Sequence, residues 1–144
     1  MQPRPAEAGF TLIEIMVVVF ILGLLVTLVA PKIIGRTDDA RKVKAAADIK
    51  GIESALQMFK LDCGFYPSTG QGIDVLVGGS GGGGAQGCRK YNPEGYLDRV
   101  PLDPWGNRYA YFSDGQHIII KSYGADGQEG GEGKNADIDS RALD

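Results

Sequence analysis

The sequence predicts an α+β protein in which one long N-terminal helix packs on a small antiparallel β-sheet that carries a C-terminal loop. Three observations lead to this fold class. An apolar stretch runs from Phe10 to Pro31, an amphipathic pattern of helical period follows it, and two strand-like segments lie further on with turn residues between them. The 144 residues and net charge of −3 leave one domain's worth of chain outside the apolar stretch, and nothing indicates nucleic acid as the main partner.

Residues 1–9, MQPRPAEAG, have the composition of a leader that is removed. They contain two prolines, one Arg and one Glu, and they offer no apolar face to bury. An ordinary secretory signal is cut after its apolar region at small residues, but 27–31 provides only Ala30 followed by a proline. We therefore expect cleavage ahead of the apolar region, after Gly9.

Residues 10–31 are long enough to cross a bilayer, because about 20 helical residues at roughly 1.5 Å each span its hydrocarbon core. The alternative is a buried helix of a soluble protein. Basic residues lie mainly after the segment, where the positive-inside rule places the cytoplasm. They are Lys32, Arg36, Arg41, Lys42 and Lys44, against Arg4 before it.

Glu14 is the charged residue within this apolar stretch. An ionised carboxylate in hydrocarbon costs about 2.5 to 3.5 kcal/mol on insertion scales, so such a residue normally has a functional partner. We expect the side chain of Glu14 to be paired when the segment is buried.

Residues 9–14, GFTLIE, followed by an apolar helix, resemble the class III leader of type IV pilins and type II secretion pseudopilins. The resemblance implies that a prepilin peptidase cuts after Gly9 and methylates the new amine of Phe10. It also implies that Glu14 faces the N-terminal amine of a neighbouring subunit in a filament. Members of these families keep the leader in the cytoplasm, so the resemblance, against the charge count, places 32–144 in the periplasm.

From Lys32 onward the chain becomes amphipathic, with apolar residues at steps of three and four and charged residues between them. The apolar positions are Val43, Ala46, Ile49, Ile52, Leu56 and Phe59. The helix should end near Asp62, because Gly64 and Pro67 follow. A helix of this length exceeds what a membrane requires, so its second half should pack on a globular domain.

Cys63 and Cys88 flank a stretch that contains the glycine run GGSGGGG. If this part of the chain lies outside the cytoplasm, the two residues are expected to form a disulfide. Closing such a loop stabilises a small domain by roughly 3 to 4 kcal/mol in the chain-entropy model. The alternative is two free thiols, and a metal pair is disfavoured because neither cysteine has a second Cys or a His at ligand spacing.

The globular part should be rich in loops, because the 22 glycines fall mostly after Gly64. We expect a short helix near 71–77 and a hairpin with strands near 108–112 and 117–122. Two blocks, YPSTGQG from Tyr66 and LDPWGNRY from Leu102, resemble the major pseudopilin of type II secretion systems. This resemblance implies a type IV pilin-like fold and favours a pseudopilin over a generic pilin.

The segment 122–139 is rich in carboxylates and glycines and cannot form a core by itself. A bending acidic loop suits Ca²⁺, which takes several oxygen ligands from side chains and carbonyls. The loop lacks the spacing of an EF-hand. The alternative to a calcium site is a solvated acidic tail.

This loop resembles the C-terminal calcium site of major pseudopilins. The resemblance implies Asp126 and Asp137 as side-chain ligands, with the carbonyls of Tyr123 and Gln128 completing the turn. Many family members have two adjacent carboxylates where this chain has Ala136 and then Asp137. Glu132, Asn135 or Asp139 could supply the ligand oxygen that the carboxylate at the position of Ala136 supplies in those members.

The sequence gives no indication of an enzyme. His117 lies beside an apolar run and is best explained as a strand residue, and no Ser has a GxSxG context. The glycine run from Gly78 lacks the Lys-Ser/Thr of a phosphate-binding loop. Trp105, between Pro104 and Gly106, is better explained by a packed turn than by a ligand platform.

The resemblance implies a major pseudopilin, anchored in the inner membrane by one helix, that polymerises into a periplasmic pseudopilus and helps to export folded proteins. Its implied partners are identical subunits, minor pseudopilins, the prepilin peptidase, the inner-membrane assembly platform and the secretin. Two alternatives stay open. One is a type IV pilin of a surface fibre for adhesion, motility or DNA uptake, and the other is a membrane-tethered calcium-binding module that does not polymerise.

Overall fold

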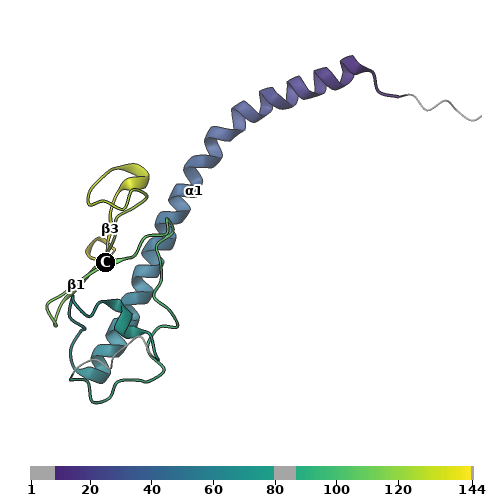
Figure 1. Cartoon of the computed structure of the whole chain (residues 1–144). Coiled ribbons are helices and arrows are strands. Elements are labelled where there is room, and N and C mark those ends of the chain that lie inside the picture. Colours follow the sequence, from purple (N-terminus) through teal and green to yellow (C-terminus); the bar gives the residue numbers. More distant parts are fainter. Residues whose placement is uncertain (1–8, 80–86, 144) are drawn as a thin grey trace, which may run out of the picture. The chain divides into compact units, whose positions relative to one another are not determined.

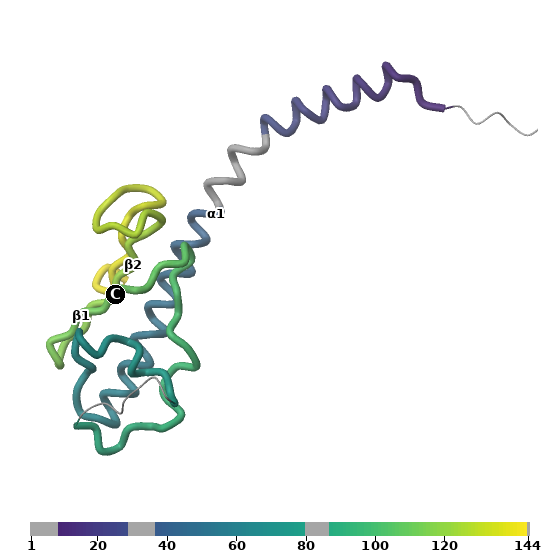
Figure 2. The backbone as a smooth tube through the Cα atoms, in the orientation of Figure 1, coloured from purple at the N-terminus to yellow at the C-terminus, as the bar shows by residue number. Residues whose placement is uncertain are grey.

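The computed structural model describes residues 9–79 and 87–143, apart from the side chains of residues 29–36 (Figure 2). The expected leader, residues 1–9, therefore lies outside the described residues except for Gly9. Contacts divide the chain into two units, Met1–Thr37 and Asp38–Asp144.

Helix α1, Leu12–Cys63, begins in the first unit and ends in the second (Figure 1). Its end matches the expected one. Gly64 follows with a φ of 84°, a left-handed conformation that glycine adopts easily, and its N–H donates to the carbonyl of Lys60 at 2.7 Å. This bond satisfies one of the open carbonyls in the last turn of the helix.

Apolar side chains of the first unit are exposed along the start of α1. The large apolar residues between Phe10 and Leu28 have exposed fractions of 47% to 81%. Across the described residues, no helix combines the length and apolar composition that crossing a membrane requires. Residues 29–31, the end of the expected membrane segment, lie outside the described side chains.

The second unit has a core built on one face of α1. The helix contributes residues at steps of four, three, four and three, the spacing that keeps side chains on one face. These are Ala45, Ile49, Ile52, Leu56 and Phe59, each at most 1% exposed.

Val43 does not belong to this face, and its expected burial was wrong. The side chain is 70% exposed. Successive residues of an α-helix are turned by about 100°, so Val43 lies about 160° around the helix from Ala45, nearly on the opposite face.

Facing the helix are a short 3-10 helix and a small sheet. Helix η1, Ile73–Leu76, falls within the predicted 71–77 and contributes three buried side chains to the core. The carbonyl of Leu76 accepts hydrogen bonds from the amides of Tyr96 and Leu97, at 2.6 and 2.9 Å. These bonds fasten the 96–97 segment to η1.

The sheet has three antiparallel strands in the order β1-β2-β3. Strands β1, Ala110–Ser113, and β2, Ile118–Ser122, form the predicted hairpin. Strand β3, Ile138–Asp139, pairs with the end of β2 and was not predicted. In the tube view β1 and β2 lie near the C-terminus, which returns to the sheet (Figure 2).

His117 lies in the hairpin turn and not in a strand, so its expected placement was wrong. Its ring nitrogen Nδ1 lies 3.1 Å from a carboxylate oxygen of Asp114 and its side chain is exposed. The two N–H groups of Gln116 and His117 donate to Asp114, which strongly lowers the pKa of that carboxyl group. The backbone N–H and the ring of His117 both contact the Asp114 carboxylate, and its carbonyl accepts a hydrogen bond from the N–H of Asp114. These contacts place His117 in the turn, ahead of the apolar strand.

Candidate functional site

The N-terminal site consists of Gly9, Phe10 and Glu14. Gly9 and Phe10 are exposed and lie in irregular backbone ahead of α1. A peptide bond in that position is open to a protease, because it is neither buried nor held in a helix. The geometry thus suits the expected cleavage between these two residues.

Glu14 has a partner within its own chain that the sequence analysis did not anticipate. Its carboxylate oxygen Oε2 accepts a hydrogen bond from the backbone N–H of Thr11 at 3.4 Å. The Thr11 hydroxyl accepts one from the N–H of Glu14 at 3.3 Å. This reciprocal pair is a capping box, which satisfies two of the open donors at a helix start. Its signal, Thr-x-x-Glu, was present in the sequence.

The C-terminal site is the loop between β2 and β3. Its two arms are joined by a hydrogen bond from the N–H of Ala125 to the carbonyl of Lys134 at 3.1 Å. Helix η2, Gly133–Asn135, precedes the return to β3. Gly124 and Gly131 both have positive φ, and a Cβ on either would come within 2.7 Å of the Asn135 carbonyl oxygen. These two glycines therefore allow the arms to close on Asn135.

Asp137 is the carboxylate of this loop that most resembles a cation ligand. Its Oδ2 accepts a hydrogen bond from the N–H of Gly130 at 3.0 Å, while its Oδ1 is buried and has no hydrogen-bond partner. A buried carboxylate oxygen without a partner is costly, so a cation there would be stabilising. Asp126 is exposed, and its Oδ1 accepts a hydrogen bond from the N–H of Gln128.

The other acidic side chains expected as ligands do not form a group of three with Asp137 among the described residues. Within residues 9–79 and 87–143, no three acidic, histidine or cysteine side chains are grouped as a metal site. Glu132 is exposed and Asn135 is half-buried, and the N–H of Asn135 donates to the carbonyl of Glu132 at 3.1 Å. Backbone carbonyls would have to provide much of the coordination.

Asp139 serves a different purpose. The Arg141 side chain donates two hydrogen bonds to its carboxylate, at 3.1 and 2.6 Å. The same carboxylate caps helix η3, Ser140–Ala142, by accepting a hydrogen bond from the backbone N–H of Arg141. These hydrogen bonds from Arg141 lower the pKa of Asp139 to about 2. A carboxylate already held in this way is a poor candidate for a calcium ligand.

Lys121 is a loop-holding residue that the sequence analysis missed. It lies opposite Asp139 in the β2–β3 register, and its ammonium group is 3.3 Å from Glu129 and 3.7 Å from Asp139. Its side chain is only 16% exposed. A lysine in a strand gives no signal of such a contact until β3 is known.

A buried network connects the 103–107 turn to the start of the loop. Asp103, 4% exposed, accepts hydrogen bonds from the amides of Trp105 and Asn107 at 3.0 and 2.7 Å and from the Ser122 hydroxyl at 2.7 Å. The Ser122 hydroxyl accepts in turn from the N–H of Gly124. The side-chain amide of Asn107 donates to the Gly124 carbonyl at 3.2 Å. Asn107 of the turn and Ser122 of β2 therefore hold the two backbone groups of Gly124, the residue at which the loop begins.

The expected disulfide between Cys63 and Cys88 is present. It joins the last residue of α1 to the segment that follows the glycine-rich stretch. The sequence analysis thus identified both cysteines, but it could not show what they hold together.

Two family models match the chain in succession. One, described as "Prokaryotic N-terminal methylation motif", matches residues 4–30. The other, "Type II secretion system (T2SS), protein G", matches residues 32–141. Together they cover both the N-terminal site and the C-terminal loop.

Relatives that match over nearly their whole length are named type II secretion system core protein G. A type II secretion system core protein G of Pseudomonas aeruginosa is 48% identical over 137 residues, covering 94% of this chain and 95% of that protein. The protein of that name from Vibrio cholerae is 46% identical, covering 96% and 94%. Among solved structures, the major pseudopilin from the type 2 secretion system of enterohaemorrhagic Escherichia coli superposes with a TM-score of 0.65 at 36% identity, covering 76% of this chain and 90% of that one.

Proposed function

The chain belongs to the family of type II secretion system protein G, and we propose that its N-terminal helix assembles identical subunits into a periplasmic pseudopilus. The observation that carries this proposal is the exposed apolar start of α1. So much apolar surface is stable only in lipid or against other protein. Transfer from the membrane to a filament is therefore possible if identical helices replace the lipid.

The proposal places the subunit in the inner membrane through residues 10–31, with the domain in the periplasm. A prepilin peptidase would cut after Gly9 and methylate Phe10. Glu14 would then exchange its capping bond for the Phe10 amine of a neighbouring subunit, which sets the axial register. Minor pseudopilins, the assembly platform and the secretin would be the other partners, and the subunit's role is structural.

Intact mass spectrometry of the protein from its own membrane tests this proposal first. We expect loss of residues 1–9 and one added methyl group on Phe10. A retained leader would contradict the filament proposal and leave an ordinary membrane anchor. Cross-linking of processed subunits through their N-terminal helices would then separate a filament from a processed monomer.

We also propose that the loop between β2 and β3 binds Ca²⁺. The unpartnered Oδ1 of Asp137 supports this, as do the five glycines of the loop with positive φ, which let carbonyls turn inward. Asp137 and Asp126 would supply side-chain oxygens, with the carbonyls of Tyr123 and Gln128 completing the site. Calcium would order a loop that has few apolar residues to order itself.

Calcium is expected to raise the melting temperature of the full chain in detergent. Ligand at 100 times its Kd stabilises the folded state by about 2.7 kcal/mol, which for a domain of this size corresponds to a rise on the order of 10 °C. Asp137→Asn should remove the rise. Asp139→Asn is the matched control and should keep it, because Arg141 already holds Asp139. An unchanged melting temperature across the calcium titration would contradict the calcium site and indicate that the loop is only solvated.

A further inference from the structure

The disulfide joins the last residue of α1 to the segment that begins at Cys88. Cys63 and Cys88 are 25 residues apart in sequence, with Cα atoms 4.6 Å apart. The sequence 78–87, GGSGGGGAQG, contains no large apolar side chain. Glycine-rich chain loses much conformational entropy on ordering and gains little from burial. The glycine-rich stretch does little by itself to hold Cys88 in place, and the bridge is the covalent link that keeps it at the end of α1.

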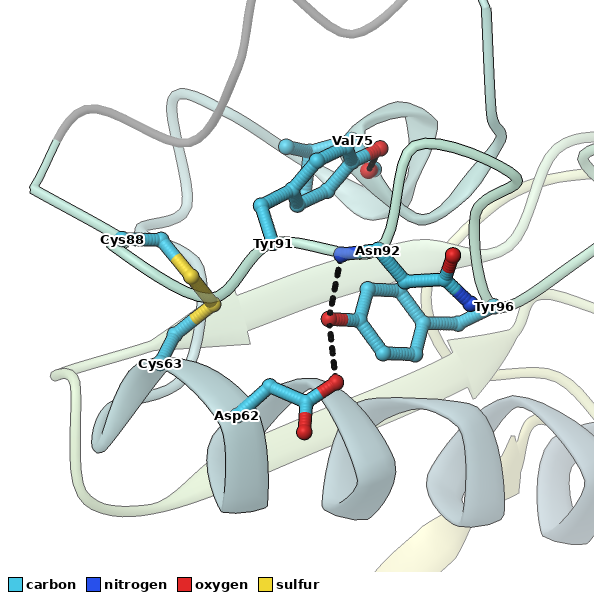
Figure 3. Close-up of a disulfide and its surroundings, with 7 residues drawn as sticks. All are labelled: Asp62, Cys63, Val75, Cys88, Tyr91, Asn92 and Tyr96. Atoms are coloured by element: carbon cyan, nitrogen blue, oxygen red, sulfur yellow. Dashed lines mark hydrogen bonds between the residues drawn. A yellow bond between two sulfur atoms is a disulfide. The ribbon is translucent and has the colours of Figure 1, made fainter.

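The residues after Cys88 complete the core beside the last turns of α1 (Figure 3). The rings of Tyr91 and Tyr96 meet Phe59 edge to face, with centroids 6.3 and 5.5 Å away. The Tyr96 hydroxyl donates to Asp62 at 2.8 Å, and the Tyr91 hydroxyl donates to the carbonyl of Val75 at 2.9 Å. If this segment detached, Phe59 would lose the cover that keeps it fully buried.

We propose that a dithiol oxidase outside the cytoplasm installs this bridge by way of Cys88, and that subunits assemble only after this oxidation. The proposal rests on the periplasmic filament function proposed above. It adds an oxidation step that must precede polymerisation. Reduced subunits would expose part of their core at Phe59 and be lost to proteolysis.

The charges around the two cysteines favour Cys88 as the first to react. Arg89 and Lys90 follow it directly and are exposed. Nearby cations favour the thiolate, which is the reactive form. Cys63 follows Asp62 and ends α1, where the negative end of the helix dipole disfavours a thiolate.

The exchange conserves atoms and electrons. The Cys88 thiolate attacks the oxidase disulfide, forming a mixed disulfide and releasing one oxidase thiolate. The Cys63 thiolate then displaces the second oxidase sulfur. The chain loses two electrons and the two thiol protons, and the oxidase disulfide is reduced to two thiols.

Single-cysteine variants of the full chain, expressed in the native cell, test which residue reacts first. On non-reducing gels, Cys63→Ser should trap a mixed disulfide with the oxidase on Cys88. Cys88→Ser should trap about tenfold less, because its remaining thiol is the less reactive one. Equal or reversed trapping would overturn Cys88 as the point of entry.

The doubly substituted chain, Cys63→Ser with Cys88→Ser, tests the requirement for the bridge. Its cross-linked oligomers should fall at least about tenfold, and protease should cut it within 64–96, because an unclosed loop opens more often. Tyr96→Phe is the matched control, since it removes the hydroxyl contact but keeps the bridge, and it should behave nearly as the wild type.

Wild-type levels of oligomers and protease resistance in the double variant would overturn the requirement for the bridge. So would free thiols, detected by alkylation, in assembled wild-type subunits. A wild-type chain that is bridged and protease-resistant but forms no oligomers would instead contradict the filament function. In that case the trapping result would still test whether Cys88 reacts first, and the protease result would still test whether the bridge stabilises the domain.

Discussion

Glu14→Gln is expected to lower the yield of cross-linked oligomers at least about tenfold while leaving the leader processed and the subunit in the membrane. A glutamine cannot pair as an anion with the Phe10 amine of a neighbouring subunit. Leaving a buried amine unpaired costs several kcal/mol in an apolar surrounding. Cross-linking of native membranes, with mass spectrometry to verify processing, measures both parts of the result.

The glutamine substitution separates the capping role that the structure shows for Glu14 from its proposed pairing with a neighbouring Phe10 amine. A Gln at this position still completes a capping box with Thr11, so it removes the charge and keeps the cap. Thr11→Ala is the complementary control, because it removes the hydroxyl that accepts from the Glu14 N–H and keeps the charge. Normal assembly of Glu14→Gln together with poor assembly of Thr11→Ala would show that Glu14 acts as a helix cap and would remove the amine-pairing idea.

Local signals in the sequence were enough to predict the regular elements. The end of α1 at Cys63 followed from Gly64 and Pro67, and the hairpin followed from turn residues at 113–115 between apolar runs. Val43 shows the limit of this approach. An apolar residue fits several helical registers, and only the packing partner, here the sheet and η1, selects the face that contains the small residue Ala45.

The parts that could not be predicted depend on contacts between distant residues. Strand β3 has two residues, too few to give a period, and it exists because β2 offers an edge. Lys121 and Asp139 become neighbours only through that pairing. The cysteine pair was predictable because a chain with two cysteines allows a single bridge, whereas the acidic loop offers many combinations of oxygen ligands.

Asp103→Ala is expected to destabilise the domain by about 3 kcal/mol or more, because it leaves two backbone amides and a buried hydroxyl without their acceptor. For a domain of this size the melting temperature should fall by about 15 °C. Thermal unfolding of the full chain in detergent, followed by circular dichroism, measures the change. Ser122→Ala is the matched control. It removes one of the three donors and should cost about 1 to 2 kcal/mol.

The effect of Asp103→Ala should extend to the loop between β2 and β3 that is proposed to bind calcium, although Asp103 does not touch a proposed ligand. The carboxylate orders the turn that presents Asn107, and Asn107 and Ser122 hold the two backbone groups of Gly124. Tyr123, the residue directly before Gly124, is a proposed carbonyl ligand. The stabilisation by calcium should therefore shrink in this variant. A variant with wild-type stability would contradict the network, and one that is destabilised but keeps the full calcium response would show that the loop is ordered independently of the turn.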